Sequence, residues 1–146
     1  MEIQIMLQRK IPGLGSQKIK QQLKKLFADL DFHEGELSIL FTDDERIAEL
    51  NHRYFKRQGP TNVLAFPMLS GTSPHLESGM LGDVVISVDT AISESQELGE
   101  PLQRTVDRLL IHGILHLLGY DHEGSAKEAL RMRREENRLL NLVMEV

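Results

Sequence analysis

Segments with the hydrophobic period of a β-strand alternate with segments of helical period along this chain, and this alternation most restricts its fold. Apolar and polar side chains alternate over residues 1–7 and again over residues 37–41, as in strands with one buried face. Residues 62–66 and the nearly continuous apolar run 81–88 also indicate strands, the second covered on both faces. Apolar residues at helical spacing mark the other segments. The resulting order β-α-β-α-β-β-α-α-α predicts a small sheet with helices packed against it in one domain.

Local signals predict where the helices begin and end. Residues 42–45 (T-D-D-E) and 125–128 (S-A-K-E) have the capping-box pattern that opens a helix. Gly99 stands where a glycine commonly ends a helix, and Pro101 can occupy the first turn of the next one. Residues 70–79, with three serines, two glycines and a proline, are predicted to form a loop.

Size and composition restrict the class of protein. With 146 residues, 40% hydrophobic and 27% charged, the chain has the composition of one soluble globular domain. The absence of cysteine excludes disulfides, thiolate metal sites and a cysteine nucleophile. A formal net charge of −5 argues mildly against nucleic-acid binding through bulk charge. Residues 1–5 lack a signal-peptide pattern, and no run approaches the ~18 apolar residues of a membrane span, so we expect a cytoplasmic protein.

Three of the six histidines fall within the eleven residues 112–122, H-G-I-L-H-L-L-G-Y-D-H. His112 and His116 are four residues apart on a predicted helix, so their rings project from one face about one turn apart. Gly119 allows the chain to leave the helix through a left-handed conformation and to bring the following residues round. His122 can then supply a third imidazole. The spacing therefore predicts a site for one metal ion.

Three neutral imidazoles leave one position of a tetrahedral ion open, which is typical of catalytic zinc. Zinc held in this way lowers the pKa of a bound water molecule to about 7. A pair of histidines at this spacing also occurs by chance, and a lone histidine beside leucines is more often a core residue. The third histidine and the intervening glycine favour a site for one Zn²⁺. The other three histidines are predicted to be surface residues: His33, His52 and His75.

The same spacing, H-x-x-x-H-x-x-G-x-x-H, occurs in the metzincin proteases. Those enzymes use a glutamate directly after the first histidine as general base, and Gly113 stands at that position here. Glycine cannot take a proton, so either another group acts as the base or the substrate's own oxygens assist, as those of a phosphodiester can. A metal-free helix–turn–helix scaffold would leave the three histidines unexplained. The sequence does not identify the catalytic residues.

Residues 112–122 match in full the signature H-G-x-L-H-L-x-G-Y-D-H of the YbeY family of bacterial rRNA maturation factors, which this chain closely resembles. Two further blocks agree in order and approximate spacing. Leu50-Asn51, Tyr54 and then P-T-N-V-L-A-F-P at residues 60–67 are similar to the family's L-N-x-x-Y-R…P-T-[DN]-V-L-S-F-P. Residues 81–87, L-G-D-V-V-I-S, are similar to its L-G-D-I-x-I-s strand. The resemblance covers essentially the whole chain and implies a single metal-dependent hydrolase domain over residues 1–146.

The resemblance implies an α+β fold of zinc-hydrolase type, with a small, mainly parallel four-stranded sheet and about five helices. It implies a zinc-dependent endoribonuclease specific for single strands, acting in rRNA processing, including maturation of the small-subunit rRNA 3′ end, and in ribosome quality control. Ligation of one Zn²⁺ carries over to His112, His116 and His122. The partners that it implies are rRNA and the ribosome or its assembly factors. We expect no membrane and no DNA partner.

Two positions depart from the family pattern, and they lie close to a basic and aromatic patch. The arginine that usually follows the tyrosine of the L-N block is Phe55 here, and the serine of L-S-F is Ala65. Next to Phe55, basic side chains that can contact phosphates are predicted to bind RNA: Arg53, Lys56 and Arg57. We expect Arg57, ahead of Lys56, to take over the phosphate contact. A solvated helix end with two aromatic residues in the core is the alternative interpretation.

The last predicted helix alternates arginines with glutamates, which favours an outer face of ion pairs over an RNA-binding strip. These residues are Arg131, Arg133, Arg134 and Arg138 with Glu128, Glu135 and Glu136. Two other functions stay open at this point. One is a metzincin-like metalloprotease that lacks its usual base, and the other is a non-catalytic ribosome-assembly factor in which the metal ties helix to loop.

Overall fold

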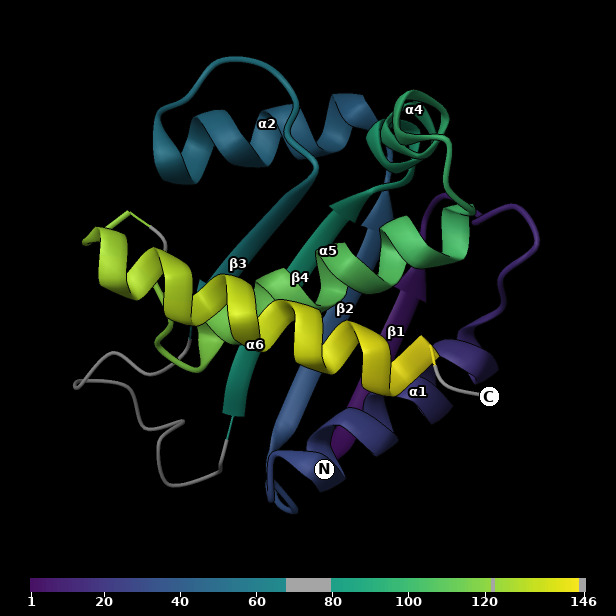
Figure 1. The fold of residues 1–146 in the computed structure, drawn as a ribbon. Coiled ribbons are helices and arrows are strands. Elements are labelled where there is room, and N and C mark those ends of the chain that lie inside the picture. Colours follow the sequence, from purple (N-terminus) through teal and green to yellow (C-terminus); the bar gives the residue numbers. More distant parts are fainter. Residues whose placement is uncertain (68–79, 122, 145–146) are drawn as a thin grey trace.

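The computed structural model describes residues 1–67, 80–121 and 123–144, and the predicted loop at 70–79 lies outside them. Four strands and five helices follow one another in the described residues, in the order that the sequence predicts (Figure 1). The strands are β1 (Glu2–Leu7), β2 (Glu36–Thr42), β3 (Val63–Pro67) and β4 (Met80–Ser87). The helices are α1 (Ser16–Asp29), α2 (Asp44–Phe55), α4 (Val88–Leu98), α5 (Leu102–Leu117) and α6 (Ala126–Met144).

The four strands form one mixed sheet in the order β1-β2-β4-β3. β1, β2 and β4 are parallel to one another, and β3 runs antiparallel to β4. The α+β class is therefore confirmed, while the expectation of a mainly parallel sheet holds for three strands and not for β3. Antiparallel neighbours do not need the helical crossover that parallel neighbours need, so consecutive strands can pair in this way.

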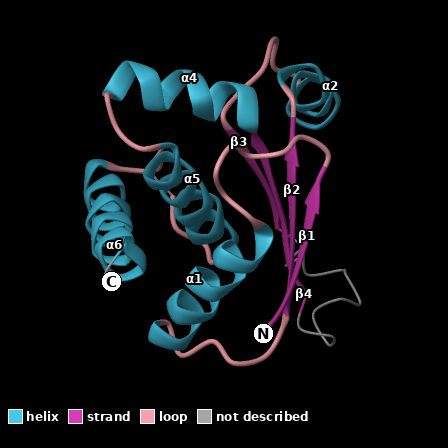
Figure 2. Cartoon of the chain, turned by 90° about the vertical axis from the view of Figure 1, so that its right-hand side faces the viewer, coloured by secondary structure: helices cyan, strands magenta, loops and turns pink. Residues whose placement is uncertain are grey.

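Helices cover the two faces of the sheet unequally (Figure 2). α1, α4, α5 and α6 lie on one side and enclose the main core, whereas α2 packs on the other face. β4 contributes to both sides, because Val84 and Ile86 belong to the main core and Val85 belongs to the cluster under α2. This confirms the prediction that the run 81–88 contains a strand covered on both faces.

The helix ends follow the predicted signals with two changes, of which the first is that Pro101 is the N-cap of α5 rather than its first residue. Ser125 Oγ accepts a hydrogen bond from the Glu128 backbone N–H at 3.1 Å, and Gly99 ends α4 in a left-handed conformation with φ 63°. At α2 the cap is Asp43 rather than Thr42, since Asp43 Oδ1 accepts from the Arg46 N–H at 2.8 Å. Thr42 is still the last residue of β2, where its hydroxyl donates to the Gln8 side chain.

α5 lies directly on strands β3 and β4 because residue 113 has no side chain. A Cβ atom at Gly113 would stand 2.9 Å from Val84 Cγ1 and 3.3 Å from Val63 Cγ2. Valine is stiff at χ1, so neither strand could make room by turning a flexible side chain. Gly113 therefore permits the close approach between helix and sheet.

α5 also buries a carboxyl group in its contact with α1. Asp107 is 3% exposed, and its Oδ2 accepts a hydrogen bond from Gln22 Nε2 at 2.9 Å. Burial raises the pKa of Asp107 to about 6, and the Gln22 hydrogen bond and the positive charge of Lys18 only partly oppose it. Among the described residues, Gln22 Oε1 is a buried acceptor without a hydrogen-bond partner.

Asp107 therefore makes stability depend on pH. Its pKa rises on folding from 3.8 to about 6, so the stability conferred by the protonated group is fully present below pH 3.8 and is lost as the pH approaches 6. We expect Asp107→Asn to remove this slope and to raise the free energy of unfolding at pH 7 by on the order of 2 kcal/mol. Denaturant unfolding of both proteins at pH 4.5 and pH 7.5 measures the effect. An identical pH dependence in the two proteins would contradict it.

Candidate metal centre

His112 and His116 lie one turn apart on α5, as their spacing predicts. Their Nε2 atoms are 3.1 Å apart. The ring centroids are 4.6 Å apart, and the rings stand at 77° to each other. Both side chains are partly exposed, in contrast to the buried leucines beside them on the helix. The two imidazoles therefore present nitrogen atoms to one point at the surface.

This nitrogen pair fits a zinc ion. Two ligand atoms at about 2.0–2.1 Å from a tetrahedral zinc ion stand about 3.3 Å from each other. The observed separation of 3.1 Å is close to that value. Imidazole nitrogen is also a preferred zinc donor, so His112 and His116 can occupy two of the four coordination positions.

His122, the third predicted ligand, lies outside the described residues. Within the residues that the structure describes, His112 and His116 form a pair, and no group of three potential metal-binding side chains is found. The set of three histidines therefore stays a prediction.

A residue that the sequence interpretation placed elsewhere contacts this pair. Glu136 Oε1 on α6 lies 2.5 Å from His112 Nδ1 on α5. The prediction that Glu136 belongs to an outer face of ion pairs is therefore wrong. The same prediction holds for Glu135, which forms an ion pair with Arg138. Arg138 also forms an ion pair with Asp29 at 2.7 Å. The alternation of charges along the helix carries no signal that separates Glu136 from Glu135.

A cavity of about 620 Å³ opens beside the two histidines at the edge strand β3. Phe55 at the end of α2, Arg57 in the loop after it and Ala65 on β3 line this cavity together with His112 and His116. The tertiary structure thus places the cation that we predicted to contact phosphate in the same cavity as the histidine pair.

The other two predicted RNA-binding residues are engaged elsewhere. The guanidinium of Arg53 lies 6.0 Å from the centroid of the Tyr54 ring. Lys56 Nζ donates a hydrogen bond to the Arg53 backbone oxygen at 3.2 Å. Of the predicted set, Arg57 is the residue that lines the cavity with the histidines.

Asn51 of the L-N block holds the loop that carries Arg57. Its side chain is 5% exposed, and Nδ2 donates to the Gly59 oxygen at 3.0 Å. The Arg57 N–H in turn donates to the Asn51 oxygen at 3.4 Å. Between them, Lys56 takes a left-handed conformation, φ 57°, that turns the chain out of α2. A buried amide thus fixes the path of the loop.

The aromatic pair before this loop is exposed. Tyr54 is 57% exposed and Phe55 is 41% exposed. Each ring lies 5.4 Å from the ring of Phe66 on β3. The alternative interpretation is therefore wrong in placing these two aromatic residues in the core, although the helix end is solvent-exposed as it supposed.

Gly119 ends α5 in the way that the sequence predicts. Its φ is 98°, in the region that favours glycine. The Gly119 N–H donates to the His116 oxygen at 3.1 Å, and the Tyr120 N–H donates to the Leu115 oxygen at 2.9 Å. This pair of bonds is a Schellman motif, which satisfies the last carbonyl groups of the helix and reverses the chain.

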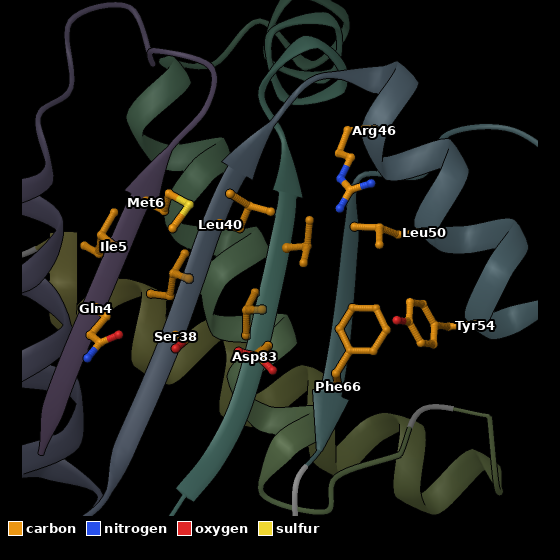
Figure 3. A pocket seen from close by; sticks show the side chains of 13 residues that line it. Gln4, Ile5, Met6, Ser38, Leu40, Arg46, Leu50, Tyr54, Phe66 and Asp83 are labelled. Carbon is orange, nitrogen blue, oxygen red and sulfur yellow. The ribbon is translucent and has the colours of Figure 1, made fainter.

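A second cavity, of about 670 Å³, lies on the sheet face beneath α2 (Figure 3). Gln4, Ser38 and Asp83 stand at one level of three neighbouring strands, and Phe66 continues the row on β3. Burial raises the pKa of Asp83, and a hydrogen bond with Ser38 opposes that shift. This cavity is lined by carboxyl, amide, hydroxyl, guanidinium and apolar groups, whereas His112 and His116 line the cavity beside α5, to which we therefore assign the candidate metal centre.

The histidines outside the signature that the structure describes lie at the surface. His33 is an exposed residue whose Nε2 lies 2.7 Å from Asp31 Oδ1, and His52 is exposed, as predicted. His75 lies outside the described residues.

None of the described helices combines the length and the apolar composition that a membrane span requires.

The conformation of Gly119 predicts the effect of a side chain there. A Cβ atom would meet no atom within 4 Å, so the cost of Gly119→Ala is backbone strain alone. We expect a loss of about 1 kcal/mol in the free energy of unfolding, because the left-handed region costs other residues about 1–2 kcal/mol. Thermal unfolding measures this loss. A variant more stable than the wild type would mean that Gly119 lies in an ordinary helical conformation.

Comparisons with known proteins relate this chain to one family. Residues 5–144 match the family model described as Endoribonuclease YbeY. A relative of that description from Syntrophus aciditrophicus is 40% identical over 144 residues, 98% of this chain and 90% of the relative. Another from Aquifex aeolicus is 44% identical over 124 residues, 85% of this chain and 81% of the relative.

A solved structure supports the fold. The solution structure of TM1509 from Thermotoga maritima superimposes with a TM-score of 0.66 at 24% identity, covering 97% of this chain and 88% of that chain. At this identity the likeness concerns the fold alone. The family is established by the family model and the curated relatives, and the protein belongs to the Endoribonuclease YbeY family.

Proposed function

We propose that this protein is a zinc-dependent endoribonuclease that cleaves single-stranded RNA and acts in rRNA processing, including maturation of the small-subunit rRNA 3′ end and ribosome quality control. The observation that carries the proposal is the pair of Nε2 atoms 3.1 Å apart at a cavity that also contains Arg57. Membership of a family described as endoribonucleases supports RNA as the substrate. Ribosomal RNA and the ribosome or its assembly factors are the proposed partners.

His112, His116 and His122 would hold one Zn²⁺ at the cavity beside α5. When bound, zinc supplies a Lewis acid and lowers the pKa of a bound water molecule. The protein supplies the position of this ion. The α5 backbone fixes two imidazoles on a helix packed against the sheet, and the turn at Gly119 ends that helix directly before the segment that carries His122.

Arg57 would bind a phosphate of the RNA strand next to the metal centre. A guanidinium group keeps its charge at every physiological pH and donates hydrogen bonds in a planar fork suited to phosphate. The exposed ring of Phe55 lines the same cavity as Arg57 and offers a surface for base stacking, which does not depend on base sequence, whereas the Tyr54 ring lines the cavity beneath α2. A single strand with unstacked bases can use both kinds of contact, which favours single-stranded RNA over a duplex.

The environment of Gly113 weighs against the metalloprotease alternative. The glutamate base of metzincin proteases would occupy this position, where even a Cβ atom would stand 2.9 Å from Val84 Cγ1. A glutamate side chain would have to displace the packed strands. The proposed reaction therefore uses another proton acceptor or the oxygens of the phosphodiester itself.

The function is tested by removing one ligand. We expect His116→Ala to retain less than one tenth of the zinc of the wild-type protein after dialysis and to lose RNA cleavage, since a two-ligand site binds zinc weakly. His52→Ala, which removes an exposed histidine of α2, is the matched control and should behave as the wild type. Metal analysis and cleavage of an unstructured RNA, a duplex RNA and casein measure the outcome.

The results of these assays distinguish the endoribonuclease from the metalloprotease and from the non-catalytic assembly factor. RNA cleavage that chelation abolishes and zinc restores supports the proposal. Casein cleavage would support the metalloprotease, and an inert protein that co-sediments with ribosomes would support the assembly factor. Equal zinc content in His116→Ala and wild type would contradict the assignment of the ligand.

A second prediction concerns Arg57. We expect Arg57→Ala to weaken binding of single-stranded RNA severalfold, nearly uniformly across sequences, and to reduce the dependence of log K on log salt by about 0.7, one phosphate contact. Lys56→Ala is the matched control, because Lys56 Nζ bonds the Arg53 oxygen instead of lining the cavity. Titration of labelled RNA at several salt concentrations measures both. Unaltered affinity and salt slope in Arg57→Ala would mean that Arg57 is solvated surface.

A further inference from the structure

Glu136 differs from the other acidic residues of α6 in its position and in its partner. It lies four residues after Met132 and four before Leu140, both buried, and therefore belongs to the inward stripe of the helix. Its side chain is 19% exposed, and its Oε1 is 2.5 Å from His112 Nδ1. α6 packs across α5 (Figure 1). A carboxylate on an inward stripe is costly unless a hydrogen bond satisfies it, and the His112 ring supplies that bond.

This contact favours one of the two neutral tautomers of His112. An ionised carboxylate has acceptor oxygens and no proton to donate. For an ionised Glu136 and a neutral His112, which has a single N–H, a hydrogen bond across this 2.5 Å contact places that N–H at Nδ1. The Nε2 atom then carries its lone pair, and it is the atom 3.1 Å from His116 Nε2. The nitrogen that a metal needs is thus the one that points at the second ligand.

We propose that Glu136 is a positioning residue of the metal centre, which holds the His112 ring in the orientation and tautomer that a zinc ion requires. The inference rests on the proposed function, because it needs the metal. A carboxylate behind a histidine ligand fixes the ring and increases its basicity, and the loss of such a partner weakens metal affinity by about 10- to 100-fold.

The neighbouring Glu135 provides a matched control for this role. Its side chain is 21% exposed, close to that of Glu136, and it lies on the same turn of α6. Its partner is Arg138 rather than a histidine. A general effect of removing a negative charge near the site would be similar in Glu135→Gln and Glu136→Gln, whereas positioning of His112 depends on Glu136 alone.

The test compares Glu136→Ala, Glu136→Gln and Glu135→Gln with the wild type, using competition with a chromophoric chelator to measure the zinc dissociation constant. We expect Glu136→Ala to bind zinc about 10- to 100-fold more weakly. Glu136→Gln, whose amide oxygen can still accept from Nδ1–H, should recover part of the loss. Glu135→Gln should stay within twofold of the wild type. Thermal unfolding of the metal-free proteins establishes that each variant is folded.

A spectroscopic measurement on the metal-free protein tests the tautomer independently. Long-range ¹H–¹⁵N correlation spectra should show His112 protonated at Nδ1 in the wild type and in Glu135→Gln, and a shift toward the Nε2–H form in Glu136→Ala. Wild-type zinc affinity together with an unchanged tautomer in Glu136→Ala would overturn the role of Glu136 and leave the proposed function intact. A wild-type protein that binds no zinc would overturn the proposed metal centre, and this inference with it.

Discussion

The close contact between α5 and the sheet at Gly113 is the constraint on which the candidate metal centre depends. Position 113 faces Val84 and Val63, so the rotation of the helix about its axis is fixed. Each residue of an α-helix adds about 100° of rotation, which places positions 112 and 116 on the same side, about 100° and 60° away from position 113. His112 and His116 therefore point sideways along the sheet, toward the cavity at its edge strand β3, and His112 also contacts α6. The same contact leaves no space for an acidic side chain at position 113.

Segments far apart in the sequence complete this site. The loop after α2 contributes Arg57, and α6 contributes Glu136. Both are fixed by ordinary structural devices, the buried amide of Asn51 in one case and the apolar stripe of α6 in the other. The positions of these two side chains thus depend on packing in the core, since rigid elements hold functional side chains more precisely than loops alone can.

The two positions that depart from the family pattern lie at the same cavity. Phe55 and Ala65 both line it, and Phe55 is exposed rather than packed into the core. The cationic group of this cavity wall comes from Arg57, two residues farther along a loop that leaves α2 through the left-handed Lys56. In the proposed function, Arg57 would therefore supply from a neighbouring position the charge that the family pattern places at residue 55.

The sequence by itself determined the order of the elements, the histidine pair on one helix face and the turn at Gly119, because each of these depends on residues within a few positions of one another. Tertiary structure decided the direction of β3, the choice of Arg57 over Arg53 and Lys56, and the separation of Glu136 from Glu135. Each of these depends on which segment of the chain packs against the residue. The hydrophobic and charge periodicity of the sequence would be the same for either strand direction and for either partner. Charge alternation along α6 describes a solvated face equally well whether one glutamate meets an arginine or a histidine from another helix. Only the packing of α6 on α5 distinguishes them.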